Sequence, residues 1–342
     1  MQRNSQVIFS PNHRFRRPVS PHCCFGTIPC LLVLIALLGA APMSFAVAPG
    51  PAAVPFRFVH GFAVVVPVTV NGHGPYDFLL DTGSTITTVD RELGRELALE
   101  TKGQGTFMTL TEQAPAPLAI AEQVVLGPLA EQNVVVMIRD LRGLHQLSST
   151  ARGVLGQNAL NHADFLLDYK HKLIEFDMDG ELARSLGGHH VPLHREPIGS
   201  NAKYANLSVH GSVNDNGLRE MDFMLDSGSA SLVLFGGVEN IGTGYQESFV
   251  ADTAGRHLLA DARDLQLVID GRSHELPTHV LAMKGAGPKI GGLLPTSIFD
   301  RIYISNRGGF AMFDPKQKKP APLKGAVASL PPDAIAPRGG GL

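Results

Sequence analysis

A ten-residue pattern occurs twice in this chain of 342 residues, and the duplication limits the possible folds more than any other feature. Residues 76–85 and 221–230 share Asp-Phe, an apolar residue, Leu-Asp, Thr or Ser, Gly and Ser. Two further pairs of segments recur in the same order, at 153–160 and 292–299 and at 165–177 and 301–314. The last pair has the form of two β-hairpins. Three ordered repeats indicate a duplicated folding unit.

The composition favours β structure. The chain is 44% hydrophobic and 18% charged, with 37 Gly and 24 Pro, which suits one or two folded domains but not long exposed helices. A net charge of −2 gives no basic surface for nucleic acid, so we expect none as a partner. We expect strands at 56–70, 106–140 and 205–313, a hairpin turn at 71–74, an amphipathic helix at 89–100 and Pro295 as the first residue of a short helix.

The N-terminus resembles an export signal. Residues 1–27 contain four Arg and no acidic residue, and an unbroken apolar run follows at 31–38. Small residues at Ser44 and Ala46 fit cleavage after Ala46, although the segment from Cys30 to Ala48 could also remain as a membrane anchor. Cleavage would remove all three Cys and leave 25 basic against 31 acidic residues, a net charge of −6. We therefore expect an exported protein that is periplasmic or secreted, or is held at the inner membrane.

Each copy of the repeated pattern ends an apolar strand with a carboxylate, Asp81 in the first half and Asp226 in the second. A following glycine permits a tight turn whose N–H groups face that carboxylate. We expect the Ser84 hydroxyl to donate to one carboxylate oxygen, and Thr82 to lie where two such loops could meet. Asp-Thr-Gly is also an ordinary turn sequence, so a single copy would be weak evidence. Two copies at matching repeat positions indicate a functional pair.

These paired motifs resemble those of aspartic proteases of the retropepsin and pepsin class, in particular the retropepsin-like enzymes of bacteria. The resemblance covers about residues 56–315. It implies an all-β, bilobal double barrel of two pseudo-symmetric lobes with short helices. In that class a downstream apolar-apolar-Gly stretch braces each loop. Leu155 and Gly156 match it in the first lobe, whereas in the second Leu294 is followed by Pro295.

The resemblance also implies roles for the loop residues. Asp81 and Asp226 would share one proton and activate a water molecule for peptide-bond hydrolysis, with no metal and no cofactor. Thr82 and Ser227 would join the two loops, and Ser84 and Ser229 would orient the carboxylates. The remaining expected supporting residues are Gly83 and Gly228.

A flap over the cleft is expected around residues 102–112. This segment lacks the Tyr of pepsin-type flaps and offers Gly103, Gly105 and Phe107 instead. Residues 253–255 of the second lobe are an alternative. His189, His190 and His194 lack acidic or Cys neighbours, so we expect a solvated linker there and no metal site.

The sequence thus predicts a leader or anchor at 1–46, a linker at 47–55, an N-terminal lobe at 56–188, a C-terminal lobe at 189–315 and a disordered tail at 316–342. We expect a monomeric endopeptidase that acts on peptide or protein substrates. Two rival hypotheses stay open. The first is a catalytically silent protein that binds peptides by strand addition, and the second is a homodimeric enzyme in which the second lobe is only a scaffold.

Overall fold

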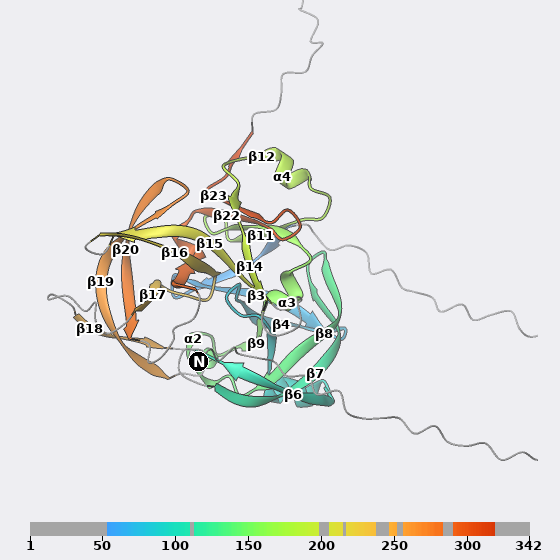
Figure 1. Cartoon of the computed structure of the whole chain (residues 1–342). Coiled ribbons are helices and arrows are strands. Elements are labelled where there is room, and N and C mark those ends of the chain that lie inside the picture. The colour runs from blue at the N-terminus through green and yellow to red at the C-terminus, as the bar shows by residue number, and fades with distance from the viewer. Residues whose placement is uncertain are drawn as a thin grey trace, which may run out of the picture.

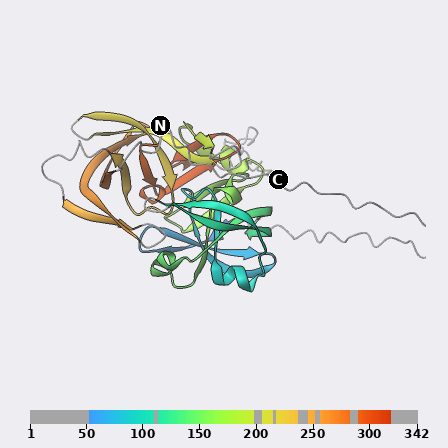
Figure 2. The ribbon, with the colours of Figure 1, turned by 60° about the horizontal axis from the view of Figure 1, so that its bottom comes forward.

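The structure is a computed structural model, and it describes residues 53–109, 113–197, 205–214, 217–236, 246–251, 256–282 and 290–318. Most of these residues lie in strands. The strands of the N-terminal half, blue to green, gather on one side, and those of the C-terminal half, yellow to orange, gather on the other (Figure 1). A second view also separates them (Figure 2). The predicted all-β, bilobal architecture is confirmed.

The first lobe is an eight-stranded sheet in which parallel and antiparallel pairs alternate near the centre. Parallel pairs join β4 to β9 and β5 to β8, and β5 and β9 are antiparallel. In spatial order its strands are β2 (Arg57–Val59), β3 (Ala63–Val70), β4 (His73–Leu80), β9 (Ala151–Leu155), β5 (Thr87–Asp90), β8 (Leu129–Arg139), β7 (Gln113–Leu126) and β6 (Thr101–Met108).

The second lobe repeats this sheet strand for strand. Its parallel pairs are β16 with β21 and β17 with β20, and β17 and β21 are antiparallel. In the same spatial order its strands are β14 (His194–Pro197), β15 (Ala205–Asn214), β16 (Leu218–Asp226), β21 (Gly292–Pro295), β17 (Leu232–Gly236), β20 (Arg272–Ala282), β19 (His257–Ile269) and β18 (Gln246–Ala251). The extra pairing of β3 with β7 recurs as β15 with β19. The two lobes are therefore related by a pseudo-two-fold axis.

A six-stranded sheet joins the lobes and has the same symmetry. The two predicted hairpins form it, and β10 of the first pairs antiparallel with β22 of the second, with Phe165 opposite Ile304. The order is β1 (Ala53–Pro55), β11 (Leu173–Asp177), β10 (Asp164–Asp168), β22 (Arg301–Ser305), β23 (Phe310–Phe313) and β13 (Val191–Pro192). The axis passes between the two central strands.

One continuous apolar core runs through both lobes and the joining sheet. Along β3 the side chains of Val64, Val66, Val68 and Val70 all enter it, because alternate residues of a strand share a face. The β3–β4 turn is the predicted one: Asn71 and Gly72 both have positive φ, 51° and 77°, which is typical of the two-residue hairpin turn that matches strand twist.

The expected helix at 89–100 is wrong in its extent. Val89 lies in β5, and α1 spans only Arg91–Glu96. The side chain of Asp90 caps it by accepting a hydrogen bond from the N–H of Glu92 at 3.2 Å. Ala98 has a positive φ of 49°, which stops the helix from continuing.

The other helices are short. They are α2 (Arg142–Leu147), α3 (Gln157–Leu160), α4 (Glu181–Ser185) and a 3₁₀ helix at Thr296–Ile298. Pro295 ends β21 and caps that 3₁₀ helix, so it is not its first residue as expected. Among the described helices none has the length and apolar character needed to cross a membrane.

Three segments expected to lack regular structure contain strands. The end of the expected linker forms β1, and the start of the expected tail forms β24 (Lys316–Gln317), which pairs with β12 (Leu186–Gly187). The His-containing segment is exposed at His189 and His190, as expected, but it also contains β13 and β14. His189 lies 2.5 Å from Asp270, and the ring of His190 stacks on Phe310 at 3.8 Å. Residues 1–52 and 319–342 lie outside the described part of the chain.

Gly153 provides a test of the packing between β4, β9 and β5. A Cβ atom at this position would overlap the Phe78 ring and lie 2.6 Å from the carbonyl oxygen of Thr88. We expect Gly153→Ala to lower the free energy of unfolding by about 1–3 kcal/mol, measured by urea denaturation. Gly103→Ala is the matched control, because a Cβ there meets nothing within 4 Å. Equal effects of the two substitutions would contradict this packing.

Candidate active site

The two carboxylates of the repeated motif meet where the lobes join. Each follows the same parallel strand pair, since Leu80 lies opposite Leu155 in the first lobe and Leu225 opposite Leu294 in the second. Both carboxyl groups are almost buried, with Asp81 8% and Asp226 9% exposed.

Thr82 and Ser227 join the two loops by reciprocal hydrogen bonds. The N–H of Thr82 donates to the Ser227 hydroxyl at 3.0 Å, and the N–H of Ser227 donates to the Thr82 hydroxyl at 3.0 Å. Each hydroxyl in turn donates across the axis at 2.8 Å, that of Thr82 to the carbonyl of Leu225 and that of Ser227 to the carbonyl of Leu80. Four buried hydrogen bonds between residues about 145 positions apart therefore fix the distance between the two Asp residues.

The glycines are required by the opposite carboxylate. A Cβ on Gly83 would lie 2.7 Å from Cγ of Asp226, and a Cβ on Gly228 would lie 3.1 Å from Cγ of Asp81. Neither glycine has a positive φ. The Gly in each motif is thus explained by the close approach of the two Asp residues and not by a strained turn.

Backbone N–H groups, and not the serine hydroxyls, orient the carboxylates. Oδ1 of Asp81 accepts from the N–H of Gly83 at 2.9 Å and of Ser84 at 3.1 Å. Oδ1 of Asp226 accepts from the N–H of Gly228 at 2.8 Å.

The expected role of the two serine hydroxyls is therefore wrong. The Ser84 hydroxyl donates to the carbonyl of Ile86 at 3.1 Å and that of Ser229 to the carbonyl of Ser231 at 2.8 Å. A carbonyl two residues along the same chain lies within reach of a Ser side chain and competes with the carboxylate.

The surroundings of the two carboxyls raise the pKa of each. Burial raises the pKa of Asp81, while hydrogen bonds from Gly83, Asp226 and Ser84 oppose that rise by stabilising its charged form. Burial and the charge of Asp81 raise the pKa of Asp226 well above its usual range. Because two adjacent carboxylates cannot both be ionised at low cost, we expect the two groups to titrate as a coupled pair.

The bracing residues differ between the lobes. In the first, the N–H of Asp81 donates to the carbonyl of Leu155 at 3.0 Å, and a Cβ on Gly156 would lie 2.9 Å from the carbonyl oxygen of Ser84. The loop therefore packs directly on the backbone at Gly156. In the second lobe Pro295 pairs with Asp226 at the corresponding position and excludes the same close approach.

Three buried supporting residues were not predicted. The side-chain amide of Gln157 donates to the carbonyl of Thr82 at 3.1 Å, and the hydroxyl of Tyr169 lies 2.5 Å from that of Thr296. Gln157 and Thr296 each follow the bracing position directly, so the second repeat could have indicated both. Tyr169, the residue after β10, contacts Thr296 of the opposite lobe, 127 positions further along the chain, and no local pattern indicates this contact.

The residues expected in a flap lie on β6, which forms a hairpin with β7. Phe107 packs against a buried apolar cluster that includes Ile86, Leu118 and Met137. Ile86 ends the Asp81 loop, so this hairpin is attached close to the carboxylates. Residues 110–112 and the alternative flap at 253–255 lie outside the described residues.

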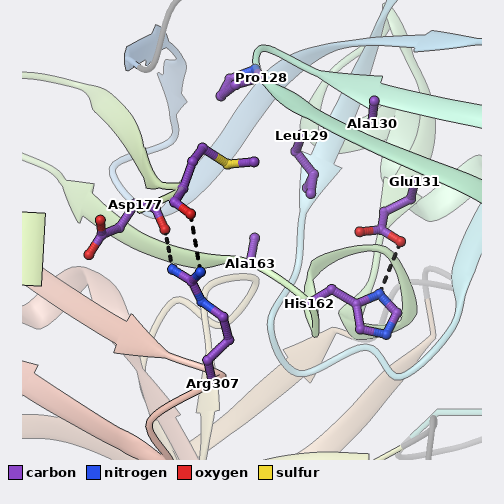
Figure 3. Close-up of a pocket in the computed structure, with 9 residues that line it drawn as sticks. Pro128, Leu129, Ala130, Glu131, His162, Ala163, Asp177 and Arg307 are labelled. Carbon is purple, nitrogen blue, oxygen red and sulfur yellow. Dashed lines mark hydrogen bonds and ion pairs between the residues drawn. The ribbon is translucent and has the colours of Figure 1, made fainter. Parts of the chain in front are cut away.

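A pocket of about 180 Å³ lies elsewhere, beside the six-stranded sheet, and neither Asp81 nor Asp226 lines it. Arg307 points across its floor (Figure 3) and donates to the carbonyls of Asp177 and Met178 and to the carboxylate of Asp164. His162 and Glu131 form an ion pair at the other side, 3.0 Å apart. The cation is engaged by the protein itself, so this pocket gives no competing site. Among the described residues, no group of three or more His, Cys, Asp or Glu is arranged so that it could hold a metal ion.

The reciprocal bonds between the loops predict unequal effects of two substitutions at Thr82. Thr82→Val removes the hydroxyl, which leaves the N–H of Ser227 and the carbonyl of Leu225 buried without a partner. We expect it to lower the free energy of unfolding by about 1–3 kcal/mol, measured by thermal and urea denaturation. Thr82→Ser keeps the hydroxyl and is the control, for which we expect a much smaller loss. Equal losses would show that these bonds do not hold the lobes together.

Comparison with known proteins agrees with this geometry. Residues 66–159, which include Asp81 and the brace at Gly156, match the family described as aspartyl protease. Among solved structures, a retropepsin-like aspartic protease from Rickettsia conorii is 16% identical over 36% of this chain and 87% of that protein, with a TM-score of 0.27. No curated protein matches the chain. The resemblance predicted from the motifs is confirmed for the first lobe, where residues 66–159 match the aspartyl protease family.

Proposed function

We propose that this chain is an exported aspartic endopeptidase in which Asp81 and Asp226 of one chain activate a water molecule. The observation that carries the proposal is the pair of nearly buried carboxyls held together by the Thr82 and Ser227 hydrogen bonds. A buried carboxyl pair is costly for stability and well suited to acid–base chemistry.

The influence of the Asp81 charge on the pKa of Asp226 supports one allocation of roles. Ionised Asp81 accepts a proton from the water, whose oxygen attacks the carbonyl carbon of the peptide bond, while Asp226 donates its proton to the carbonyl oxygen. A tetrahedral diol forms. When its C–N bond breaks, Asp81 gives its proton to the leaving amine and Asp226 recovers the proton of the diol hydroxyl. No group outside the two carboxyls needs to change its proton count.

The same proposal covers substrate and location. The substrate is an extended peptide or protein segment, because sheet edges and hairpins on both lobes can add it as a strand. Export rests on the apolar, Arg-preceded segment at 31–38, which could also attach the protein to the membrane. A monomer suffices, since one chain supplies both carboxylates.

Removal of either carboxylate tests the mechanism. We expect Asp81→Asn and Asp226→Asn each to lower kcat/KM on a diverse peptide mixture by at least about 1,000-fold, assayed with the full chain between about pH 3 and 8. Asp222→Asn is the control. It lies four residues before Asp226 on the same strand, with an exposed carboxylate that pairs with His210 at 3.0 Å.

The result separates the rival hypotheses. Peptides that bind but are never cut, with affinity kept in both Asn variants, would replace the enzyme with a peptide-binding protein. Full activity of Asp226→Asn together with a dimeric mass in solution would instead favour a homodimer that uses Asp81 twice.

The raised pKa values predict a pH dependence of stability. A carboxyl whose pKa is higher in the folded than in the unfolded chain stabilises the fold below its unfolded pKa, about 4, and loses that contribution as pH rises through the folded value. We therefore expect wild type to be less stable than Asp226→Asn at pH 7, and the difference to shrink as pH falls towards 4. Urea denaturation of both proteins across this range measures it. A difference that grows on acidification would mean that the pKa of Asp226 is lowered.

A further inference from the structure

Beyond each Asp loop, the two lobes carry chemically different groups at equivalent positions. In the first lobe Ile86, Leu118 and Met137 form the buried apolar cluster against which Phe107 of β6 packs. We refer to these four side chains as the lobe-one cluster. This cluster is separate from the main core.

The strand registers identify the matching residues in the second lobe. Thr87 pairs with Val136 as Leu232 pairs with Thr278, so the residues that precede Thr87 and Leu232, Ile86 and Ser231, correspond. In the same way, the residues that follow Val136 and Thr278, Met137 and His279, correspond.

The strand registers of the β6–β7 and β18–β19 hairpins give two further pairs of corresponding residues. Gly105 lies opposite Ala116 as Ser248 lies opposite Ala260, and Leu118 lies opposite Met137 as Ala262 lies opposite His279. Gly105 and Leu118 therefore correspond to Ser248 and Ala262.

Ser231, His279 and Ser248 form a hydrogen-bonded group, which we call the lobe-two cluster. The Ser231 hydroxyl lies 2.8 Å from Nδ1 of His279, and the Ser248 hydroxyl lies 3.3 Å from Nε2. All three side chains are half-buried and so remain open to solvent in part. Burial lowers the pKa of His279, which keeps the imidazole neutral at pH 7, with one donor and one acceptor nitrogen.

The exchange of Leu118 for Ala262 makes room for these polar groups. In the first lobe a Cβ on Gly105 would already lie 3.1 Å from Cδ1 of Leu118. In the second lobe the small side chain of Ala262 leaves this space to Ser248 and His279. The lobe-two cluster is therefore built by several coordinated exchanges and not by one surface serine.

Both clusters are attached directly to the Asp loops. The Ser229 hydroxyl donates to the carbonyl of Ser231 at 2.8 Å, and its counterpart Ser84 donates to the carbonyl of Ile86 at 3.1 Å. The two sheets repeat each other strand for strand, so the two clusters occupy equivalent positions beside Asp81 and Asp226. For a peptide lying across the two carboxyls, these positions would be on opposite sides of the bond to be cut.

We propose that the lobe-two cluster is a side-chain subsite for a hydrogen-bonding residue of the substrate, while the lobe-one cluster, whose Ile86, Leu118 and Met137 side chains are buried and apolar, offers no such hydrogen bonds on the other side of the scissile bond. His279 and the two serines are thus specificity-determining residues. The inference rests on the proposed peptidase function and deepens it: the substrate is an asymmetric peptide, with a hydrogen-bonding residue on the lobe-two side of the scissile bond.

Hydrogen-bonding groups discriminate more strongly than apolar surfaces. The two serine hydroxyls have hydrogen-bonding capacity beyond their bonds to His279, and an apolar substrate side chain would bury that capacity unused. We expect wild type to prefer Asn, Gln, Ser or Thr over Leu or Met at the lobe-two position by at least about tenfold in kcat/KM.

Transplanting the lobe-one residues tests the proposal. The full chain carrying Ser231→Ile and His279→Met is compared with wild type on a peptide library randomised on both sides of the cut. We expect the polar preference to disappear, apolar residues to become favoured at that position by about tenfold, and the preference on the other side to stay unchanged. His210→Met is the control, since this exposed His of the same lobe pairs with Asp222, away from the cluster.

A milder variant guards against misfolding. Ser248→Ala removes one hydroxyl and adds no bulk, and we expect it to reduce the polar preference several-fold while thermal denaturation stays close to wild type. An unchanged library profile in both variants would overturn the subsite and leave the peptidase function intact. A wild-type chain that cuts no peptide would overturn the peptidase function and the subsite with it.

Discussion

The reciprocal hydrogen bonds of Thr82 and Ser227 are the interaction on which the site depends. Each side chain accepts an N–H from the opposite loop and donates to a carbonyl of the opposite strand, so neither loop has its full set of bonds without the other. The six-stranded sheet aligns the lobes, and the bonds at the loops themselves hold the two carboxyls close together. Carboxyls held this close are expected to titrate as a coupled pair.

This short separation explains the rest of the motif. With the carboxyls so close, no side chain fits between a loop and the opposite Asp, so residues 83 and 228 must be glycine. With the pair almost buried, at least one carboxylate needs donors, and the N–H groups made available at Gly83 and Ser84 supply them. The strand, the Asp, the hydroxyl residue and the Gly are therefore all required by the close approach of the two carboxyls. This shared requirement explains why the same pattern occurs in both lobes.

The sequence predicted those features whose cause is local or repeated. The turn at Asn71 and Gly72, the strands that carry the two Asp residues and the hairpins of the joining sheet are of this kind. The prediction of a helix over 89–100 was wrong in its extent. Val89, Leu93 and Leu97 have helical spacing, but Val89 belongs to β5. The predicted role of the serine hydroxyls was wrong because a nearby carbonyl competes with the carboxylate as the hydrogen-bond acceptor. The residue type alone does not determine which acceptor a Ser hydroxyl uses. Tyr169 and Thr296 could not be paired at all, since only the folded topology brings β10 against the opposite lobe.

The duplicated fold is symmetric, but its chemistry cannot be. In the mechanism proposed here, one proton shared by two carboxyls must reside on one of them at any moment, and the charge of Asp81 raises the pKa of Asp226. A peptide is directional as well, so the surfaces on its two sides see different residues of the substrate. Selection on a single chain, unlike selection on a homodimer, can alter one lobe without altering the other. This freedom permits the second lobe to carry two serines and a histidine where the first lobe has an apolar cluster. The reciprocal hydrogen bonds of Thr82 and Ser227 and the glycines at 83 and 228 each involve both loops at once, and these features are the same in both lobes.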